Sequence, residues 1–110
     1  MHLERWNNAY WLTELHVQRT RDEEPRINED TFLTLQYELY PEGELKDDKS
    51  VMVRVEDRYF ELVADANTPT GVLDLPEPDI EQLRIRNTPK RRPVLVVKPW
   101  FQDYLVWESN

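Results

Sequence analysis

The strongest indication of the fold is the stretch Thr31-Phe32-Leu33-Thr34-Leu35-Gln36-Tyr37-Glu38-Leu39-Tyr40-Pro41. Its apolar and aromatic residues alternate with polar ones from position 33 to position 39. A period of two places these two sets of side chains on opposite faces of a β-strand. One face would then be buried and the other in water, as in an antiparallel sheet. The pattern predicts a strand over residues 31–41.

The segments before this stretch predict one further strand and a loop. Tyr10–Arg19 fits a strand, with Trp11, Leu15 and Val17 on one face, and it also fits a helix continuing from the N-terminus. Aromatic and β-branched residues dominate the segment, which favours the strand. The polar, aperiodic stretch 20–30 contains a proline and reads as a long loop.

Three apolar runs after residue 50 predict further strands. Val51 to Val63 reads as two strands joined by a tight turn. Val72–Leu75 follows Gly71 and is flanked by prolines, which are tolerated at sheet edges, so we expect an edge strand. The continuous run Val94–Val97 is typical of a strand covered on both faces.

The remaining segments are ambiguous. A short helical turn fits residues 2–8, and another fits residues 79–84, where a strand is the alternative. Residues 100–107 fit a helix, with Trp100, Tyr104 and Trp107 spaced four and three apart, or a last strand over 104–107. We favour the strand.

The whole pattern predicts a mainly β fold in one domain over residues 1–110. We expect a small antiparallel barrel or sandwich of about six to seven strands, with one or two short helical turns. The predicted core consists of apolar strand residues: Trp11, Leu15, Val17, Leu33, Leu35, Tyr37, Leu39, Val51, Val53, Val55, Phe60, Leu62, Leu95 and Val97.

Composition limits the class of protein. The chain has 110 residues, no cysteine and a net charge of −8. It therefore has no disulfide framework and no thiolate chemistry. No stretch approaches the roughly 18 apolar residues of a membrane span, and the N-terminus lacks the apolar segment of a signal peptide. We expect a protein that does not bind membranes and that lies in the cytoplasm or within a particle assembled there.

The charge is unevenly distributed. Residues 1–83 contain 20 acidic and 8 basic residues, a net −12, whereas residues 84–110 contain 2 acidic and 6 basic residues, a net +4. Such a run of bases usually lies in a solvated surface; the alternative is a contact patch for a phosphate backbone or for an acidic neighbour. The candidate basic patch consists of Arg84, Arg86, Lys90, Arg91 and Arg92.

Residues for catalysis are sparse. The serines, Ser50 and Ser109, lie in a charged connector and next to the C-terminus, and neither position suits a nucleophile held by rigid structure. His16 lies between two apolar strand residues and is expected to point outward. Isolated histidines without cysteines do not make a zinc site, and the scattered glycines do not form a phosphate loop. The sequence therefore predicts a protein that is not an enzyme and needs no metal or cofactor.

Two segments are candidates for binding. Trp100, Phe101, Tyr104 and Trp107 form an aromatic patch after the basic stretch, and tryptophan and tyrosine are enriched at the most energetic positions of protein interfaces. We expect this cluster, or the one near Trp6, Tyr10 and Trp11, to be partly exposed in the monomer. The acidic loop at Asp22, Glu23 and Glu24 is the second candidate.

The first hypothesis for function is a non-enzymatic protein-interaction module. It would be a subunit or accessory component of a larger assembly, such as a phage-type or secretion-type particle, and its partners could include copies of itself. The alternative is a soluble acidic inhibitor, of the immunity or anti-defence type, that blocks a basic site on a nuclease or nucleic-acid-binding target. A second alternative is nucleic-acid binding through residues 84–98.

Overall fold

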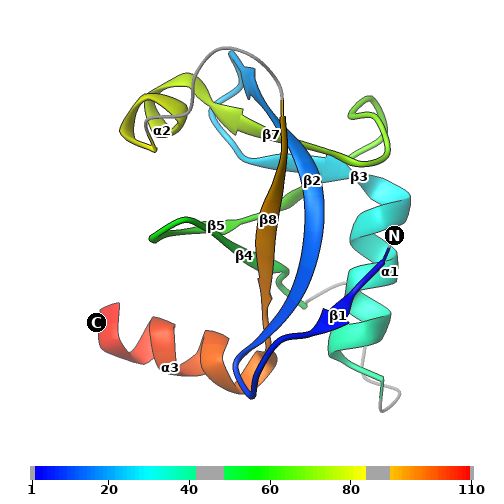
Figure 1. Ribbon diagram of the computed structural model, residues 1–110, viewed down its shortest axis with the longest axis vertical. Helices are drawn as coiled ribbons and strands as arrows, with labels where there is room; N and C mark the ends of the chain where they lie inside the picture. The colour runs from blue at the N-terminus through cyan, green and yellow to red at the C-terminus, as the bar shows by residue number, and fades with distance from the viewer. Residues whose placement is uncertain (1, 42–48, 84–89, 110) are drawn as a thin grey trace.

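A computed structural model of the protein describes residues 2–41, 49–83 and 90–109 (Figure 1). Within these residues the chain forms an eight-stranded sheet and three helices. The strands are β1 (Glu4–Arg5), β2 (Tyr10–Thr20), β3 (Arg26–Asn28), β4 (Met52–Val55), β5 (Arg58–Glu61), β6 (Val63–Asp65), β7 (Val72–Pro76) and β8 (Lys90–Val97). The helices are α1 (Glu29–Leu39), α2 (Glu77–Gln82) and α3 (Pro99–Ser109). The predicted mainly β fold is confirmed.

The sheet bends into a nearly closed barrel. Its strand order is β5-β4-β8-β2-β7-β3-β6, and β1 adds to β2 beside this path. The two ends of the path, β5 and β6, are consecutive in the chain and are separated by Leu62 alone. The Leu62 N–H donates to the Val51 carbonyl, and the Val63 N–H donates to the Pro25 carbonyl. One continuous segment therefore changes partner at Leu62 and joins the two ends of the sheet.

Most strand pairs are antiparallel, and the two exceptions are parallel: β2 with β7, and β3 with β6. The predicted β4–β5 hairpin is confirmed, with Val53 opposite Phe60. The strand predicted at Val94–Val97 is also confirmed and begins earlier, at Lys90. β7, however, lies between β2 and β3, so the prediction of an edge strand was wrong. Its proline, Pro76, lies at the strand's last position, where the ladder ends.

The core fills the inside of the barrel and extends to one face of α1. Alternate residues of β2 and β8 point inward, as the period of two requires. The described buried cluster contains Leu15, Val17, Ile27, Leu35, Leu39, Val51, Val53, Val55, Phe60, Leu62, Leu73, Leu75, Ile80, Leu83, Val94 and Val96. Trp11 packs against this cluster from a half-buried position, and Leu95 is also half-buried. Burial of each aliphatic side chain of this kind is worth about 1.5–3 kcal/mol.

Residues 29–39 form helix α1, so the strand predicted over 31–41 was wrong. Asn28 precedes the helix and caps it: its side-chain oxygen accepts hydrogen bonds from the Asp30 and Thr31 amides at 3.0 and 3.3 Å. Such a cap satisfies amides that no helical carbonyl can reach. At 100° per residue, Leu35 and Leu39 share the buried face.

The same helical period overturns two of the predicted core positions. Leu33 and Tyr37 belong to the opposite face of α1 and are 45% and 58% exposed. The four alternating apolar residues thus form two pairs, and the members of each pair are four residues apart. Leu35 and Leu39 are buried, whereas Leu33 and Tyr37 are exposed. The cap lies within the segment predicted as a loop over residues 20–30, which also contains strand β3.

Residues 99–109 form helix α3, so the strand favoured over 104–107 was also wrong. Pro99 occupies the first helical position, where its missing N–H is not needed. The Lys98 carbonyl accepts hydrogen bonds from the Phe101 and Gln102 amides, both at 3.0 Å.

The two predicted helical turns had different outcomes. Helix α2 covers Glu77–Gln82 and confirms the turn predicted near 79–84. The turn predicted over 2–8 was wrong, because β1 pairs with Trp11 and Leu12 of β2. Asn7 makes the reversal between these strands: its side-chain oxygen accepts from the Ala9 and Tyr10 amides at 2.8 and 2.9 Å.

Candidate interaction surface

Aromatic side chains gather where α3 meets the β4–β5 hairpin. We define the aromatic surface as Tyr59, Trp100, Phe101 and Tyr104, together with Arg54. Phe101 lies at its centre, with ring centroids 5.3 Å from Trp100, 5.6 Å from Tyr104 and 6.4 Å from Tyr59. Separations of this size are typical of favourable aromatic pairs. The cluster fixes α3 to the hairpin while leaving its outer rings in solvent.

The floor of this surface is Tyr10, which is 7% exposed. Its ring lies 5.5 Å from Phe101, and its hydroxyl is 2.6 Å from the hydroxyl of Tyr59. Arg54 donates from Nη1 to the Tyr10 hydroxyl at 3.4 Å. The Arg54 guanidinium also stands 5.9 Å from the Tyr10 ring centre and 5.8 Å from that of Tyr59. A cation at this distance is attracted by the electron-rich faces of both rings.

This arrangement shifts two ionisation equilibria. Burial raises the pKa of Tyr59, and the hydrogen bond with Tyr10 raises it further. The hydrogen bond with Tyr10 likewise raises the pKa of Arg54, outweighing the opposing effect of burial. The site therefore presents a permanent cation beside the neutral phenol of Tyr59 at physiological pH.

The start of α3 is also fixed to the N-terminal segment. The Trp100 indole N–H donates to the Asn8 carbonyl at 2.6 Å. The Lys98 ammonium donates to the Asn7 carbonyl at 2.9 Å and lies 4.8 Å from the centre of the Trp11 ring. Tyr10 and Trp11 of the predicted N-terminal aromatic cluster therefore lie beside the start of α3.

Exposure confirms that aromatic residues of both predicted clusters are partly uncovered in the monomer. Trp100 is 55% exposed, Tyr104 51% and Trp6 58%. Trp107 lies in α3, but its side chain is outside the described residues.

The sequence prediction missed the residues that the hairpin contributes. Tyr59 and Arg54 are direct cross-strand partners in the β4–β5 register. Arg54 alternates with the buried Val53 and Val55, so the period of two already places it on the outer face. The register would have placed Tyr59 beside it, but nothing in the sequence places either residue next to α3.

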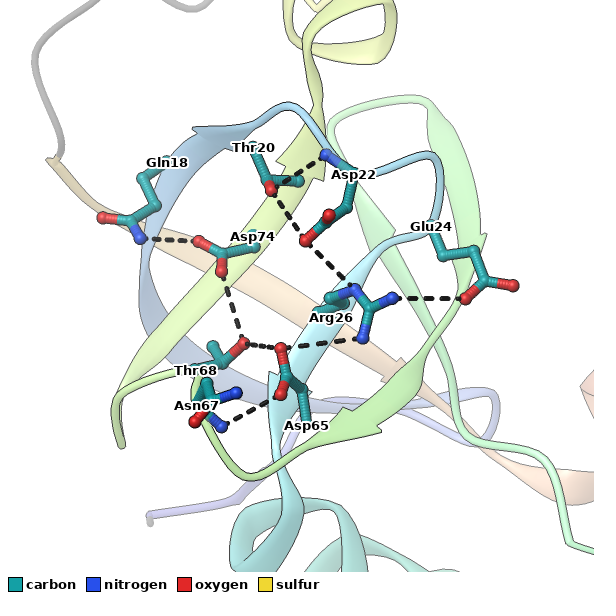
Figure 2. A network of polar contacts seen from close by, with 9 residues as sticks. All are labelled: Gln18, Thr20, Asp22, Glu24, Arg26, Asp65, Asn67, Thr68 and Asp74. Carbon is teal, nitrogen blue, oxygen red and sulfur yellow. Dashed lines mark hydrogen bonds and ion pairs between the residues drawn. The ribbon is translucent and has the colours of Figure 1, made fainter.

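The acidic loop is largely engaged with the protein itself (Figure 2). The Arg26 guanidinium lies 3.3 Å from Asp22, 3.7 Å from Glu24 and 3.6 Å from Asp65. The Arg26 Nε atom and Asp22 form an ion pair that lacks hydrogen-bond geometry. Glu23 is exposed between the two paired acids. Two of the three predicted acidic binding residues thus already share a cation.

Behind Arg26, two carboxylates of the same network meet at one hydroxyl. The buried Thr68 hydroxyl lies 3.1 Å from Asp65 and 3.3 Å from Asp74 (Figure 2). Asp74 also accepts from the Gln18 amide at 2.6 Å. Hydrogen bonds from the Asn67 amide and the Thr68 hydroxyl, with the Arg26 charge, hold the pKa of Asp65 below its usual value. This network joins β3, β6 and β7.

The described part of the basic patch does not form one surface. Arg91 points outward and lies 3.6 Å from Glu14. Arg92 is half-buried opposite the core residue Leu15, and its Nε has no hydrogen-bond partner among the described residues. Arg84, Arg86 and the Lys90 side chain lie outside the described residues.

Other predicted features concern His16, metals and membranes. His16 is exposed on β2, as predicted, and lies directly across from Arg91. In the described residues, no group of three or more histidine and acidic side chains is arranged to hold a metal ion. Among the same residues, no helix combines the length and the apolar character needed to cross a bilayer.

The chain belongs to DUF5802, a family of unknown function, whose model matches residues 2–105. No curated protein matches the sequence. The family match covers the barrel, α1, α2 and the first turns of α3, including every residue of the aromatic surface.

Proposed function

We propose that this protein is a non-enzymatic interaction module that binds a protein partner through the aromatic surface. It acts as a subunit or accessory component of a larger assembly, of the phage-type or secretion-type kind, in the cytoplasm. The partner can be a different protein or a second copy of the chain.

The exposure of two large rings on adjacent turns of α3 carries this proposal. Trp100 and Tyr104 are each more than half exposed and lie four residues apart on the helix. Tryptophan, tyrosine and arginine are the residue types enriched at the centres of protein interfaces. The aromatic surface combines all three types, with Arg54 beside Tyr59.

The fixed geometry of the surface supports the same conclusion. The Trp100 indole is held by Asn8, and Tyr104 rests against Phe101. Side chains that are already ordered lose less conformational entropy on binding, and the cost of ordering one flexible side chain is about 0.5–1.5 kcal/mol. The surface is therefore preorganised for a partner.

The chemistry of the surface indicates what the partner should present. Apolar or aromatic side chains would cover Trp100 and Tyr104, and a carboxylate would pair with Arg54. Residues 1–83 of this chain carry a net charge of −12. A second copy can therefore supply that carboxylate, which makes self-association a direct first test.

The experiment compares two matched pairs of exposed residues. The double variant Trp100→Ala, Tyr104→Ala removes the rings of α3, and the double variant Leu33→Ala, Tyr37→Ala removes the exposed pair at the same spacing on α1. Sedimentation velocity and native mass spectrometry report self-association over a concentration series. The purified protein, immobilised and incubated with native lysate, reports other partners.

The proposal predicts that the wild-type protein and the α1 variant associate alike, and that the α3 variant does not. Loss of two central aromatic side chains should weaken binding by about tenfold or more. A wild-type protein that stays monomeric at high concentration and recovers no partner would contradict the proposal. Loss of binding in the α1 variant alone would place the interface on α1 instead of α3 and would also contradict the proposal.

A further inference from the structure

The barrel wall has an opening beside the middle of β2. One edge of β2 pairs with β8 along residues 10–17. The other edge pairs with β1 at Trp11 and Leu12 and with β7 from His16 onward. Residues 13–15 of β2 lie between these two partners, so on this edge neither β1 nor β7 pairs with them (Figure 1).

The opening leaves backbone groups without a strand partner. The His16 N–H donates to the Gly71 carbonyl at 2.9 Å, so the backbone groups of His16 face β7. Alternate residues of a strand direct their backbone groups to the same edge, so those of Glu14 face the opening. On the other edge Glu14 lies opposite Pro93, which has no N–H to donate. The Glu14 N–H and carbonyl therefore point into the opening, where they can donate a hydrogen bond to a ligand and accept one from it.

A pocket of about 290 Å³ occupies this place. Its volume is close to the lower limit of about 300 Å³ for small-molecule sites. Two buried threonines line it: Thr13 from β2, which is 5% exposed, and Thr31 from the first turn of α1, which is 6% exposed. Neither threonine hydroxyl makes a hydrogen bond with another described residue. Among the described residues, the buried side-chain atoms without a partner are the Nε atoms of Arg26 and Arg92. The two threonine hydroxyls are therefore open to the pocket and available to a ligand.

The mouth of the pocket carries charges of both signs. Arg91 and Glu14 lie 3.6 Å apart, with side chains 64% and 60% exposed. Glu4 of β1 also lines the pocket and lies 3.3 Å from His2. Leu12 and Leu15 supply the apolar part of the wall. The lining thus offers one guanidinium, one imidazole, two carboxylates, three threonine hydroxyls and an apolar surface within a small volume.

We propose that this pocket binds a small zwitterion of the α-amino acid type. Its carboxylate pairs with Arg91 and the Glu14 N–H. Its ammonium group pairs with the carboxylate of Glu4 or Glu14, and its side chain enters toward Thr13 and Leu15. This site is independent of the aromatic surface, since none of its lining residues belongs to that surface.

The test is a titration of the ¹⁵N-labelled full chain with free L-alanine, L-serine and L-leucine, followed by amide chemical shifts. Ethylamine and acetate serve as probes that carry one charge each. We expect saturable shifts at the Glu14 and Gly71 amides with at least one amino acid at millimolar concentration. The single-charge probes should bind about tenfold more weakly, because a charge-assisted hydrogen bond is lost.

Three variants sharpen the titration. Thr13→Val keeps the side-chain shape and should weaken binding about fivefold by removing a hydroxyl partner. Arg91→Gln should weaken it about tenfold, whereas Arg58→Gln, a matched change of an exposed arginine that does not line the pocket, should leave it unchanged. The variant Trp100→Ala, Tyr104→Ala should also leave it unchanged, which separates this site from the proposed interface.

Two outcomes would overturn the proposal. One is the absence of saturable shifts at Glu14 and Gly71 with every amino acid tested. The other is equal binding of acetate or ethylamine alone, because it would show that only one charge of the zwitterion is recognised.

Discussion

Helices α1 and α3 have the same length, 11 residues, and opposite roles. α1 begins at a side-chain cap and buries Leu35 and Leu39 against the barrel. α3 begins at a proline without such a cap in the described structure, and it leaves Trp100 and Tyr104 in solvent. In α1 the residues Leu35 and Leu39, spaced four apart, are buried in the core. In α3 the residues Trp100 and Tyr104, at the same spacing, are exposed. A periodicity thus predicts which residues share a face, but not what that face contacts.

The largest expected effect concerns the buried face of α1. Leu35→Ala should lower the free energy of unfolding by about 2–5 kcal/mol, because Leu35 is fully buried and its loss leaves a cavity. Leu33→Ala, two residues away, should change it by about 0.5 kcal/mol or less. Urea unfolding followed by circular dichroism measures both. Equal losses for the two variants would support a strand with both residues on one buried face.

The next effect tests the cap that distinguishes the two helices. Asn28→Ala should cost roughly 1 kcal/mol, because two amides of the first turn lose their acceptor. Asn28→Asp keeps an acceptor oxygen and should recover most of this loss, although the hydrogen bond from Asn28 to the Thr68 carbonyl is gone. Chemical denaturation of the two variants side by side gives the comparison. A loss as large with aspartate as with alanine would mean that the bond to Thr68 matters more than the cap.

On α3 the same kind of truncation should affect stability less. Tyr104→Ala removes a half-exposed ring that contacts Phe101, and should lower the free energy of unfolding by at most about 1 kcal/mol. Its effect on partner binding should be larger than its effect on folding. Thermal unfolding together with the association assay separates the two. A loss comparable to that of Leu35→Ala would show that this face of α3 is part of the core.

The smallest effect concerns pH and the network that supports the start of α1. The pKa of Asp65 is held below its ordinary value of 3.8, so its carboxylate stabilises the fold above that pH. This contribution is lost as the pH falls through the lower pKa of the folded state. Asp65→Asn should therefore be less stable than wild type at pH 7, and the difference should shrink in acid. Urea midpoints at neutral and acidic pH measure it, and a difference that stays constant with pH would contradict the role of the charge.

Much of the barrel could be predicted from the sequence. The β4–β5 hairpin, β2 and β8 each carry their burial pattern within a few consecutive residues, and a period of two requires no knowledge of the partner strand. The β2–β7 parallel pair could not be predicted in this way, because it joins residues more than 50 positions apart. The same limit applied to the candidate site: Trp100, Phe101 and Tyr104 were found by composition, whereas Arg54 and Tyr59 were missed.

Residues 31–41 show the difference between what the sequence determined and what the tertiary structure decided. The sequence by itself determined a mainly β domain, its apolar residues and an aromatic cluster near the C-terminus. Only the tertiary structure decided that residues 29–39 form a helix. Leu33, Leu35, Tyr37 and Leu39 fit either period, and the choice depends on which faces meet a surface to be buried against. Two features favour the helix: Asn28 caps its first amides, and Leu35 and Leu39 pack into the core. Neither feature can be read from the alternating pattern itself.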